Sequence, residues 1–376
     1  MIYFDNASTS WPKPRSVIAA VADSMKHLAA NPGRSGHKMA IEAGEKVFEC
    51  REEIASFFGL SDPCRVIFTL NATHALNIVI NGILNNGDHV IYTQMAHNSV
   101  QRPVWAKRGE IQITSVPAKA DGSTDIASVE KAIKPDTKLI IITHASNVCG
   151  TYSDLGEYGK LAKKHNVKLL VDASQSAGIL DINMERDNID FLAMPGHKAL
   201  YGPMGTGVLC INTSADLKPL MCGGTGSYSH ELNQPRELPD LLESGTLNFP
   251  GICGLLAGIR FVKALGANNI YKHEMKLTEF LLNEISELGS YSVVGRGDLN
   301  KRLGVVSVVC KSHSSAELAE YLNTDYNIAA RALFHCSYSS HVALGTQQSG
   351  TLRISFGVFN TIGQLKTLLY ALEHIA

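Results

Sequence analysis

The sequence of 376 residues has almost no excess charge of either sign, because 34 Lys and Arg stand against 35 Asp and Glu. A chain without a basic surplus has no general attraction for nucleic acid or for an anionic membrane surface. It also lacks an apolar run near the roughly 18 residues of a membrane span. The N-terminus, MIYFDN, has no basic segment before an apolar one, as a secretory signal would. We therefore expect a cytoplasmic protein with neither a nucleic-acid nor a membrane partner.

No two cysteines have the C-x-x-C spacing, and no His and Cys residues have the spacing of a zinc site. This absence argues against a bound metal. A cytoplasmic chain of this size needs no disulfides, so we expect most cysteines to be small core residues. The eight are Cys50, Cys64, Cys149, Cys210, Cys222, Cys253, Cys310 and Cys336. The hydrophobic content of 45% is typical of a globular chain, and the length suggests two or three domains.

Short β-branched runs alternate with helical patterns over the first two thirds of the chain. The expected strands are 65–70, 89–94, 111–116, 139–143, 167–171, 191–194 and 207–211. The expected helices among them are 72–84 and 155–165. This alternation predicts βαβ units and an α/β fold with a mostly parallel, doubly wound sheet.

After residue 250 the pattern changes to that of a smaller α+β domain. The expected helices are 253–264, 276–288, 315–322 and 362–374, and the expected strands are 304–310 and 352–356. We predict a large domain over residues 16–250, and a small domain built from residues 1–15 and 251–376.

Polar side chains follow the expected strands of the large domain. In an open α/β sheet, ligands bind outside the carboxyl ends of the strands. The residues there include Asn71, Thr73, His97, Asn147, Asp172, Gln175, His197 and Lys198. Together they predict a site for an anionic, nitrogen-containing aromatic ligand.

Three of these positions suggest particular chemistry. Asp172 ends a very apolar strand, where a carboxylate needs a cation such as a protonated pyridine, although a helix cap or a buried ion pair would also explain it. Lys198 stands between an apolar strand and a glycine-rich turn, where an amine can become nucleophilic, although it could be a surface lysine. The second GHK tripeptide, at Lys38, has no preceding strand. Asn71 opens a helix directly after a strand, which suits a phosphate or simply a helix cap.

Cys336 is the one cysteine with a chemical context. It lies among Arg331, His335 and His341 in a stretch rich in Ser and Tyr, which predicts an exposed loop. Neighbouring cationic side chains favour the nucleophilic thiolate. The alternative is an unreactive loop thiol.

These motifs make the sequence resemble the pyridoxal-phosphate (PLP) enzymes of aminotransferase class V, and within them the cysteine desulfurases. The resemblance is strongest to the group II branch, which includes selenocysteine lyases. Its motifs cover nearly the whole chain in a fixed order: 4–9, 71–77, 97–98, 146–150, 172–178, 196–198, 243–248 and 331–336. Such an ordered set is far more specific than a lone glycine motif. The resemblance implies the PLP-dependent transferase fold of type I.

The resemblance also implies roles at the cofactor. Lys198 would hold PLP covalently and later move the substrate's α-proton. Asp172 would keep the pyridine nitrogen protonated, which makes the ring an electron sink. His97 would stack on the ring, and Asn147 and Gln175 would hydrogen-bond its oxygen.

For the phosphate, the resemblance implies contacts from within the chain and from a second copy. The contacts are the Ala72 backbone, Thr73, His197 and Thr246 of the partner subunit. A homodimer would then be needed to complete each site. Two positions depart from the family pattern: Pro195 replaces a hydroxyl residue, and Ala72 replaces a common Thr, so one or two phosphate contacts are missing or replaced. A third departure is Ala96, where a carboxylate is usual just before the histidine.

At the substrate, the resemblance implies that Cys336 is the nucleophile. Arg353 would grip the substrate carboxylate, ideally as a bidentate pair, with Arg331 and Asn147 as further contacts. His37 resembles a histidine near the substrate's sulfur or selenium. The implied activity is conversion of L-cysteine to L-alanine, with a persulfide on Cys336 that passes to an acceptor thiol.

Three readings stay open from the sequence. The first is this cysteine desulfurase, which could also act on L-selenocysteine. The second is a class V aminotransferase or a β-eliminating PLP lyase in which Cys336 is incidental. The third is a binding or regulatory protein on a PLP-enzyme scaffold, which intact Lys198 and Asp172 disfavour. The sequence names neither the sulfur acceptor nor the pathway.

Overall fold

The large domain is built on a seven-stranded sheet, seen in a computed structural model that describes residues 1–33 and 35–375. The strand order is β2-β8-β7-β6-β5-β3-β4. The strands are β2 (Val66–Thr69), β3 (His89–Thr93), β4 (Gln112–Val116), β5 (Thr137–Thr143), β6 (Lys168–Asp172), β7 (Phe191–Pro195) and β8 (Gly207–Ile211). Among these seven strands, β8 alone runs in the opposite direction to the other six, so the predicted mostly parallel sheet is confirmed.

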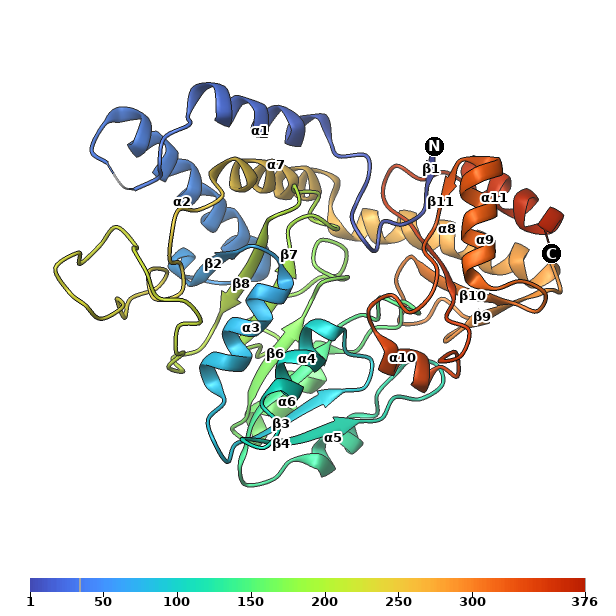
Figure 1. Cartoon of the computed structure of the whole chain (residues 1–376), viewed down its shortest axis with the longest axis horizontal. Helices are drawn as coiled ribbons and strands as arrows, with labels where there is room; N and C mark the ends of the chain where they lie inside the picture. Colours follow the sequence, from blue (N-terminus) through green and yellow to red (C-terminus); the bar gives the residue numbers. More distant parts are fainter. Residues whose placement is uncertain (34, 376) are drawn as a thin grey trace.

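Helices cover both faces of this sheet, as a doubly wound fold requires (Figure 1). One buried cluster joins alternate strand residues to α2 (Lys38–Phe58), α5 (Ile126–Ala132), α6 (Leu155–Lys164) and α7 (Phe249–Leu265). The other cluster joins the intervening strand residues to α3 (Ala72–Ile83) and α4 (Asn98–Ala106). Strand residues such as Leu169 and Leu170 therefore pack on opposite faces, which explains why the strands read as unbroken apolar runs.

The small domain has its own three-stranded antiparallel sheet and its own core. The strand order is β12-β10-β9, with β9 (Tyr291–Val294), β10 (Val305–Cys310) and β12 (Leu352–Ser355). Helices α8 (Ala267–Glu287), α9 (Ser315–Tyr326) and α11 (Ile362–Ile375) pack in the same buried cluster. The N-terminal strand β1 (Ile2–Tyr3) pairs with β11 (Ile328–Ala329). A short helix, α10 (Tyr338–Ala343), follows the Cys336 loop.

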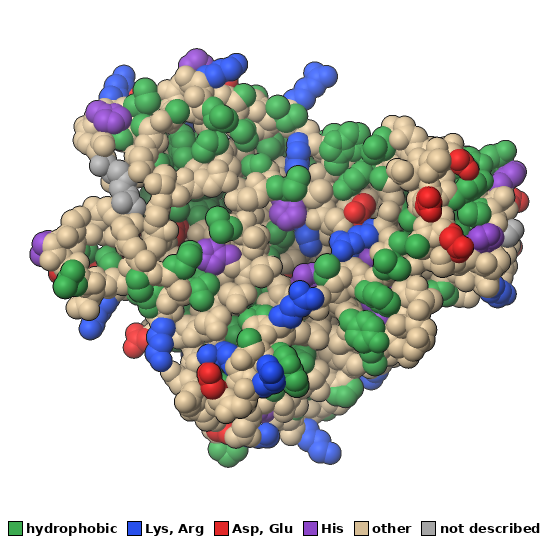
Figure 2. Space-filling view, in the orientation of Figure 1, with side chains coloured by type: hydrophobic (Ala, Val, Ile, Leu, Met, Phe, Trp, Pro, Cys, Tyr) green, Lys and Arg blue, Asp and Glu red, His purple; other side chains and the backbone are tan. Residues whose placement is uncertain are grey.

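The segment after β1 connects the two domains. Figure 1 shows it leaving the small domain and crossing to α1 (Arg15–His27), which lies along α7 on the large domain. The buried residues of α7 pack in the large-domain core, although α7 lies almost wholly beyond residue 250. Within the described residues, no single helix is long and apolar enough to cross a membrane, and one bent pair, α7 with α8, passes by length and composition alone. The face shown in Figure 2 mixes hydrophobic, basic and acidic side chains.

Candidate active site

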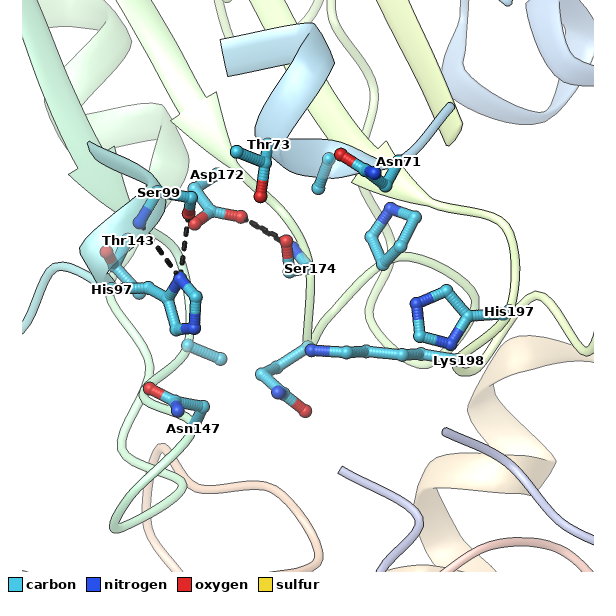
Figure 3. A pocket seen from close by; sticks show the side chains of 14 residues that line it. Asn71, Thr73, His97, Ser99, Thr143, Asn147, Asp172, Ser174, His197 and Lys198 are labelled. Atoms are coloured by element: carbon cyan, nitrogen blue, oxygen red, sulfur yellow. Dashed lines mark hydrogen bonds between the residues drawn. The ribbon is translucent and has the colours of Figure 1, made fainter. Parts of the chain in front are cut away.

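A cavity of about 170 Å³ opens at the carboxyl ends of the large-domain strands (Figure 3). Eight residues predicted to bind the cofactor line it: Ala72, Thr73, His97, Asn147, Asp172, Gln175, His197 and Lys198. Its other lining residues are Asn71, Ser99, Thr143, Ala145, Ser174 and Pro195. These eight residues follow strand ends more than 100 residues apart in the chain. The fold brings them together in one site, as the sequence predicted.

Lys198 enters this cavity from the turn after β7. In Figure 3 its amine points toward the centre of the group of side chains. Burial lowers the pKa of Lys198 to about 8, and the nearby carboxylate of Asp172 opposes that shift. The preceding Gly196 is needed for this turn, because a Cβ there would lie 2.3 Å from Thr206 Oγ1. A buried amine with a lowered pKa is a better nucleophile and base than an ordinary lysine.

Asp172 lies at the end of β6 and is 3% exposed. Both the N–H and the hydroxyl of Ser174 donate to Asp172 Oδ1, with the N–H at 3.0 Å. Because these bonds use one carboxylate oxygen, Oδ2 can receive another donor from the cavity. These hydrogen bonds fix the orientation of the buried carboxylate.

His97 is the N-cap of α4 and lies on the opposite side of the cavity from Lys198 (Figure 3). Its Nδ1 accepts from the Ser99 N–H at 3.1 Å, so the neutral ring carries its proton on Nε2. Burial lowers the pKa of His97, which favours this neutral form. The ring is thus fixed in tautomer and orientation by the first turn of its own helix.

The two amides predicted to face the ring oxygen have different partners. Asn147 donates from Nδ2 to the His335 carbonyl at 2.7 Å, and its buried Oδ1 has no partner among the described residues. Gln175 donates from Nε2 to the Ala7 carbonyl at 3.1 Å. The buried Thr143 Oγ1 is also unpartnered in the described part of the chain. Unpaired polar atoms on a cavity wall indicate a polar ligand.

The end of the cavity beside α3 has the features of an anion site. The Asn71 side chain caps the helix by accepting from the His74 N–H at 2.9 Å, and the first helical N–H groups have no acceptor within the helix. Gly207 lets β8 approach this turn, because a Cβ there would lie 2.5 Å from the backbone of Asn71. Burial lowers the pKa of the neighbouring His197 to about 4, so this ring is neutral and can donate one hydrogen bond. Pro195 also lines the cavity and supplies no donor.

Two predicted substrate-binding arginines meet on the small-domain side. Arg353, on β12, is 1% exposed, and it donates to Asp5 Oδ1 at 2.7 Å, to Ser8 Oγ at 2.8 Å and to the Asn147 carbonyl at 2.9 Å. Arg331 pairs with Arg353 through two backbone hydrogen bonds. The buried Nε of Arg353 has no partner in the described part of the chain. The two guanidiniums thus share one location, and one of them keeps a free donor.

Cys336 is exposed and lies 3.4 Å from a terminal nitrogen of Arg331. Its loop is tied to the cavity, because the Cys336 carbonyl accepts from the Asn98 N–H at 2.9 Å, next to His97. Cys336 itself has a φ of 59°, in the left-handed region that non-glycine residues rarely adopt. Strained backbone of this kind is concentrated at functional sites.

Of the cationic neighbours that the sequence predicted for this thiol, Arg331 lies beside it and His335 does not. His335 is 2% exposed and shares a 2.8 Å hydrogen bond with Thr351 Oγ1. Burial lowers the pKa of this ring far below its ordinary value. The histidine therefore anchors the loop and is neutral.

Five predicted site residues lie outside the cavity lining: Arg331, Cys336 and Arg353, described above, and Thr246 and His37. Thr246 is exposed, and its hydroxyl accepts from Asn31 Nδ2 at 3.3 Å. His37 is exposed and caps α2 by accepting from the Ala40 N–H at 3.3 Å. Both belong to loops at the edge of the large domain, so a single chain does not bring them to Lys198.

Four further residues shape the site without having a predicted role: Asp5, Ser8, Ser99 and Ser174. Ser99 and Ser174 each lie two residues after a predicted site residue, and their backbone N–H groups donate to its side chain. At Asp172 this is an Asx turn, a local pattern that the sequence carries. Asp5 and Ser8 contact the arginines from the other end of the chain. The one sequence signal for Asp5 and Ser8 is that both lie in the family motif at residues 4–9.

These observations fit PLP, the cofactor that the resemblance implies. Asp172 Oδ2 can receive a pyridine N–H, the capped helix end suits a phosphate, and the Lys198 amine is positioned for a covalent bond. Asn147 Oδ1 and Thr143 Oγ1, which have no partner among the described residues, are available to hydrogen-bond polar atoms of the cofactor. Asp172, Lys198 and Asn147 would hold the cofactor.

Comparisons with known proteins agree with this site. The aminotransferase class-V family matches residues 2–368. A probable cysteine desulfurase of Methanothermobacter thermautotrophicus is 34% identical over 100% of this chain and 94% of its own length. A cysteine desulfurase of Escherichia coli is 29% identical over 100% and 93%. The apo structure of cysteine desulfurase from Thermococcus onnurineus NA1 is 32% identical, covers 100% of this chain and 94% of its own, and superposes with a TM-score of 0.94. The chain therefore belongs to the aminotransferase class-V family.

Proposed function

We propose that this protein is a PLP-dependent cysteine desulfurase that converts L-cysteine to L-alanine and leaves the sulfur on Cys336 as a persulfide. The observation that carries the proposal is the position of Cys336. Its exposed thiol lies beside Arg331, in a loop bonded to the residues around Lys198. The probable and named cysteine desulfurases among its relatives, which match over the full chain, support the same activity.

In this reaction, Arg353 binds the substrate carboxylate, for which its unpaired Nε and its fixed guanidinium are suited. The neutral amine of Lys198 Nζ takes the α-proton and can return a proton to carbon. Asp172 would hold the ring nitrogen of PLP in its protonated state. PLP, when bound, supplies an aromatic ring that accepts the electrons released at the substrate's α-carbon.

Cys336 Sγ, as a thiolate, attacks the substrate sulfur. The carbon–sulfur bond of the substrate breaks and its electron pair stays on carbon, where a proton completes the methyl group of alanine. A sulfur–sulfur bond forms on Cys336, so one cysteine and one protein thiol give one alanine and one persulfide. An acceptor thiol then takes the terminal sulfur. The Arg331 guanidinium beside Sγ stabilises the thiolate that begins this step.

Product analysis tests the proposal. The purified protein, loaded with PLP, is given L-cysteine with a thiol reductant, and the small-molecule products are separated. We expect alanine and sulfide in equal amounts. Pyruvate with ammonia would indicate a β-eliminating lyase, and an oxo acid formed only with an amino acceptor would indicate an aminotransferase. Either result would refute the desulfurase.

We further propose a homodimer with composite sites. Thr246 and His37 are exposed in loops away from the chain's own cavity, which suits residues that serve a second copy. Sedimentation at working concentration should give a dimer, and a fully active monomer would contradict it. Action on L-selenocysteine and an acceptor protein stay predictions from the resemblance, and a cytoplasmic location stays a prediction from the sequence.

A further inference from the structure

The hydroxyl of Ser8 lies at the centre of the two-arginine group. It accepts from Arg353 at 2.8 Å and from Arg331 at 3.0 Å, and it donates to Asp5 Oδ1 at 2.8 Å. A serine hydroxyl has one proton and two lone pairs, so these three bonds use its whole capacity. Ser8 is therefore fixed in one rotamer by charged partners on every side.

Arg331 depends on this hydroxyl for its orientation. In the described part of the chain, its guanidinium makes side-chain hydrogen bonds to Ser8 Oγ through one terminal nitrogen and to Cys336 Sγ through the other. Asp5 pairs with Arg353 and not with Arg331. Because two neighbouring guanidiniums repel each other, Arg331 would turn away from Arg353 without the oxygen between them. It would then also leave the sulfur.

We propose that Ser8 is a positioning residue for the nucleophile, whose hydroxyl holds the Arg331 guanidinium against the Cys336 sulfur. The inference rests on the proposed function, since it gives Cys336 the role of nucleophile. It adds that the reactivity of this small-domain thiol depends on the N-terminal segment, which crosses between the domains (Figure 1).

The same segment provides a matched control. Ser10, two residues further along, donates through its hydroxyl to the carbonyls of His197 and Lys198, at 3.1 and 2.9 Å. It makes no hydrogen bond to either arginine among those the structure describes. Loss of the Ser10 hydroxyl perturbs the same segment without touching Arg331, so it separates a general loosening from the effect proposed for Ser8.

The experiment measures the alkylation rate of Cys336 by iodoacetamide at neutral pH, in the full-length protein with PLP bound. Peptide mass spectrometry separates Cys336 from Cys222, the other exposed cysteine, which serves as the internal reference. We expect Ser8→Ala to slow alkylation of Cys336 by about threefold to tenfold, the effect of losing one charge-assisted hydrogen bond. Ser8→Thr, which keeps the hydroxyl, and Ser10→Ala should alkylate at the wild-type rate.

Arg331→Gln provides the second arm. It should slow alkylation at least as much as Ser8→Ala, and the double variant should be no slower than Arg331→Gln alone, because both changes remove the same contact. In turnover, Ser8→Ala should lower kcat more than it raises KM, because Arg353 keeps its hydrogen bonds to Asp5 and to the Asn147 carbonyl. Wild-type alkylation in Ser8→Ala, or additive effects in the double variant, would overturn the inference. Failure of the desulfurase proposal is seen separately, in the products formed from cysteine.

Discussion

The two sides of the site hold their reactive groups in different ways. Asp172 is buried at the end of β6, and Lys198 is half-buried in the turn after β7, where burial of its amine lowers the pKa. Cys336 is exposed on a loop with left-handed backbone, and Arg331, which forms an isolated bridge to β12, lies beside it. The fold therefore preorganises the side that moves the proton, Lys198 and Asp172. The side that carries the sulfur, Cys336, stays exposed so that the sulfur can be transferred.

The largest effect should follow from Lys198→Ala. We expect loss of the visible absorption of the bound cofactor and a fall in turnover of at least about a thousandfold, because both the covalent link and the base are removed. Lys38→Ala is the matched control, since Lys38 lies in the second GHK tripeptide, is exposed and, among the described residues, forms an ion pair with Glu42 alone. Covalent cofactor found on any lysine other than Lys198 after borohydride reduction would contradict the assignment.

Asp172 should follow in size. Asp172→Ala should lower kcat by about a hundredfold or more, because only a carboxylate stabilises a protonated ring nitrogen. Asp172→Glu keeps the charge and should lose much less. The absorption spectrum checks that both variants still bind PLP. Similar, near wild-type turnover in the two variants would remove Asp172 from the mechanism.

On the side of the site that carries Cys336, Arg353→Ala should act mainly on substrate binding. We expect kcat/KM for cysteine to fall by about tenfold to a hundredfold, with most of the change in KM, because the carboxylate loses a charged partner. Arg353→Lys should recover part of the lost kcat/KM, since an ammonium restores the positive charge but cannot bind the carboxylate through two parallel N–H groups. An unchanged KM in both variants would place the carboxylate elsewhere.

The smallest expected effect is a change in the pH at which the Lys198 amine becomes reactive. Because burial lowers the pKa of Lys198 to about 8, its neutral fraction should rise as the pH passes through about 8, against about 10.4 for an exposed lysine. Reductive methylation of cofactor-free protein, read at each lysine by mass spectrometry, checks this. Lys198 reacting with the same pH profile as the exposed Lys38 would show that burial does not control the amine.

Much of the buried side could be predicted from the sequence. Each strand end places a polar residue at the same edge of the sheet, so the rule for α/β sheets brought Asp172, His97 and Lys198 together. The fold class and the strands of the large sheet followed from the same alternation. Helix α2 was not predicted. Its buried face includes Ala, Cys and Arg51, so the helical spacing of large apolar residues is weak there.

The open side could be predicted only in part. The sequence placed both Arg331 and His335 near Cys336, but which of them faces the thiol depends on tertiary packing, which brings Arg331 beside it and turns His335 inward to Thr351. The contacts of Ser8 with two arginines join positions more than 300 residues apart. No local pattern encodes such a contact, since it arises from the way the N-terminal segment crosses between the domains.

The most direct test of the account is to locate the sulfur. The PLP-loaded protein is mixed with about one equivalent of L-cysteine without reductant, trapped with an alkylating reagent, digested, and read by mass spectrometry alongside Cys336→Ala. We predict one added sulfur on the Cys336 peptide, alanine in matching amount, and neither product in the variant, which should keep its cofactor absorption. Alanine formed at the wild-type rate by Cys336→Ala, or sulfur found on another cysteine, would contradict the account.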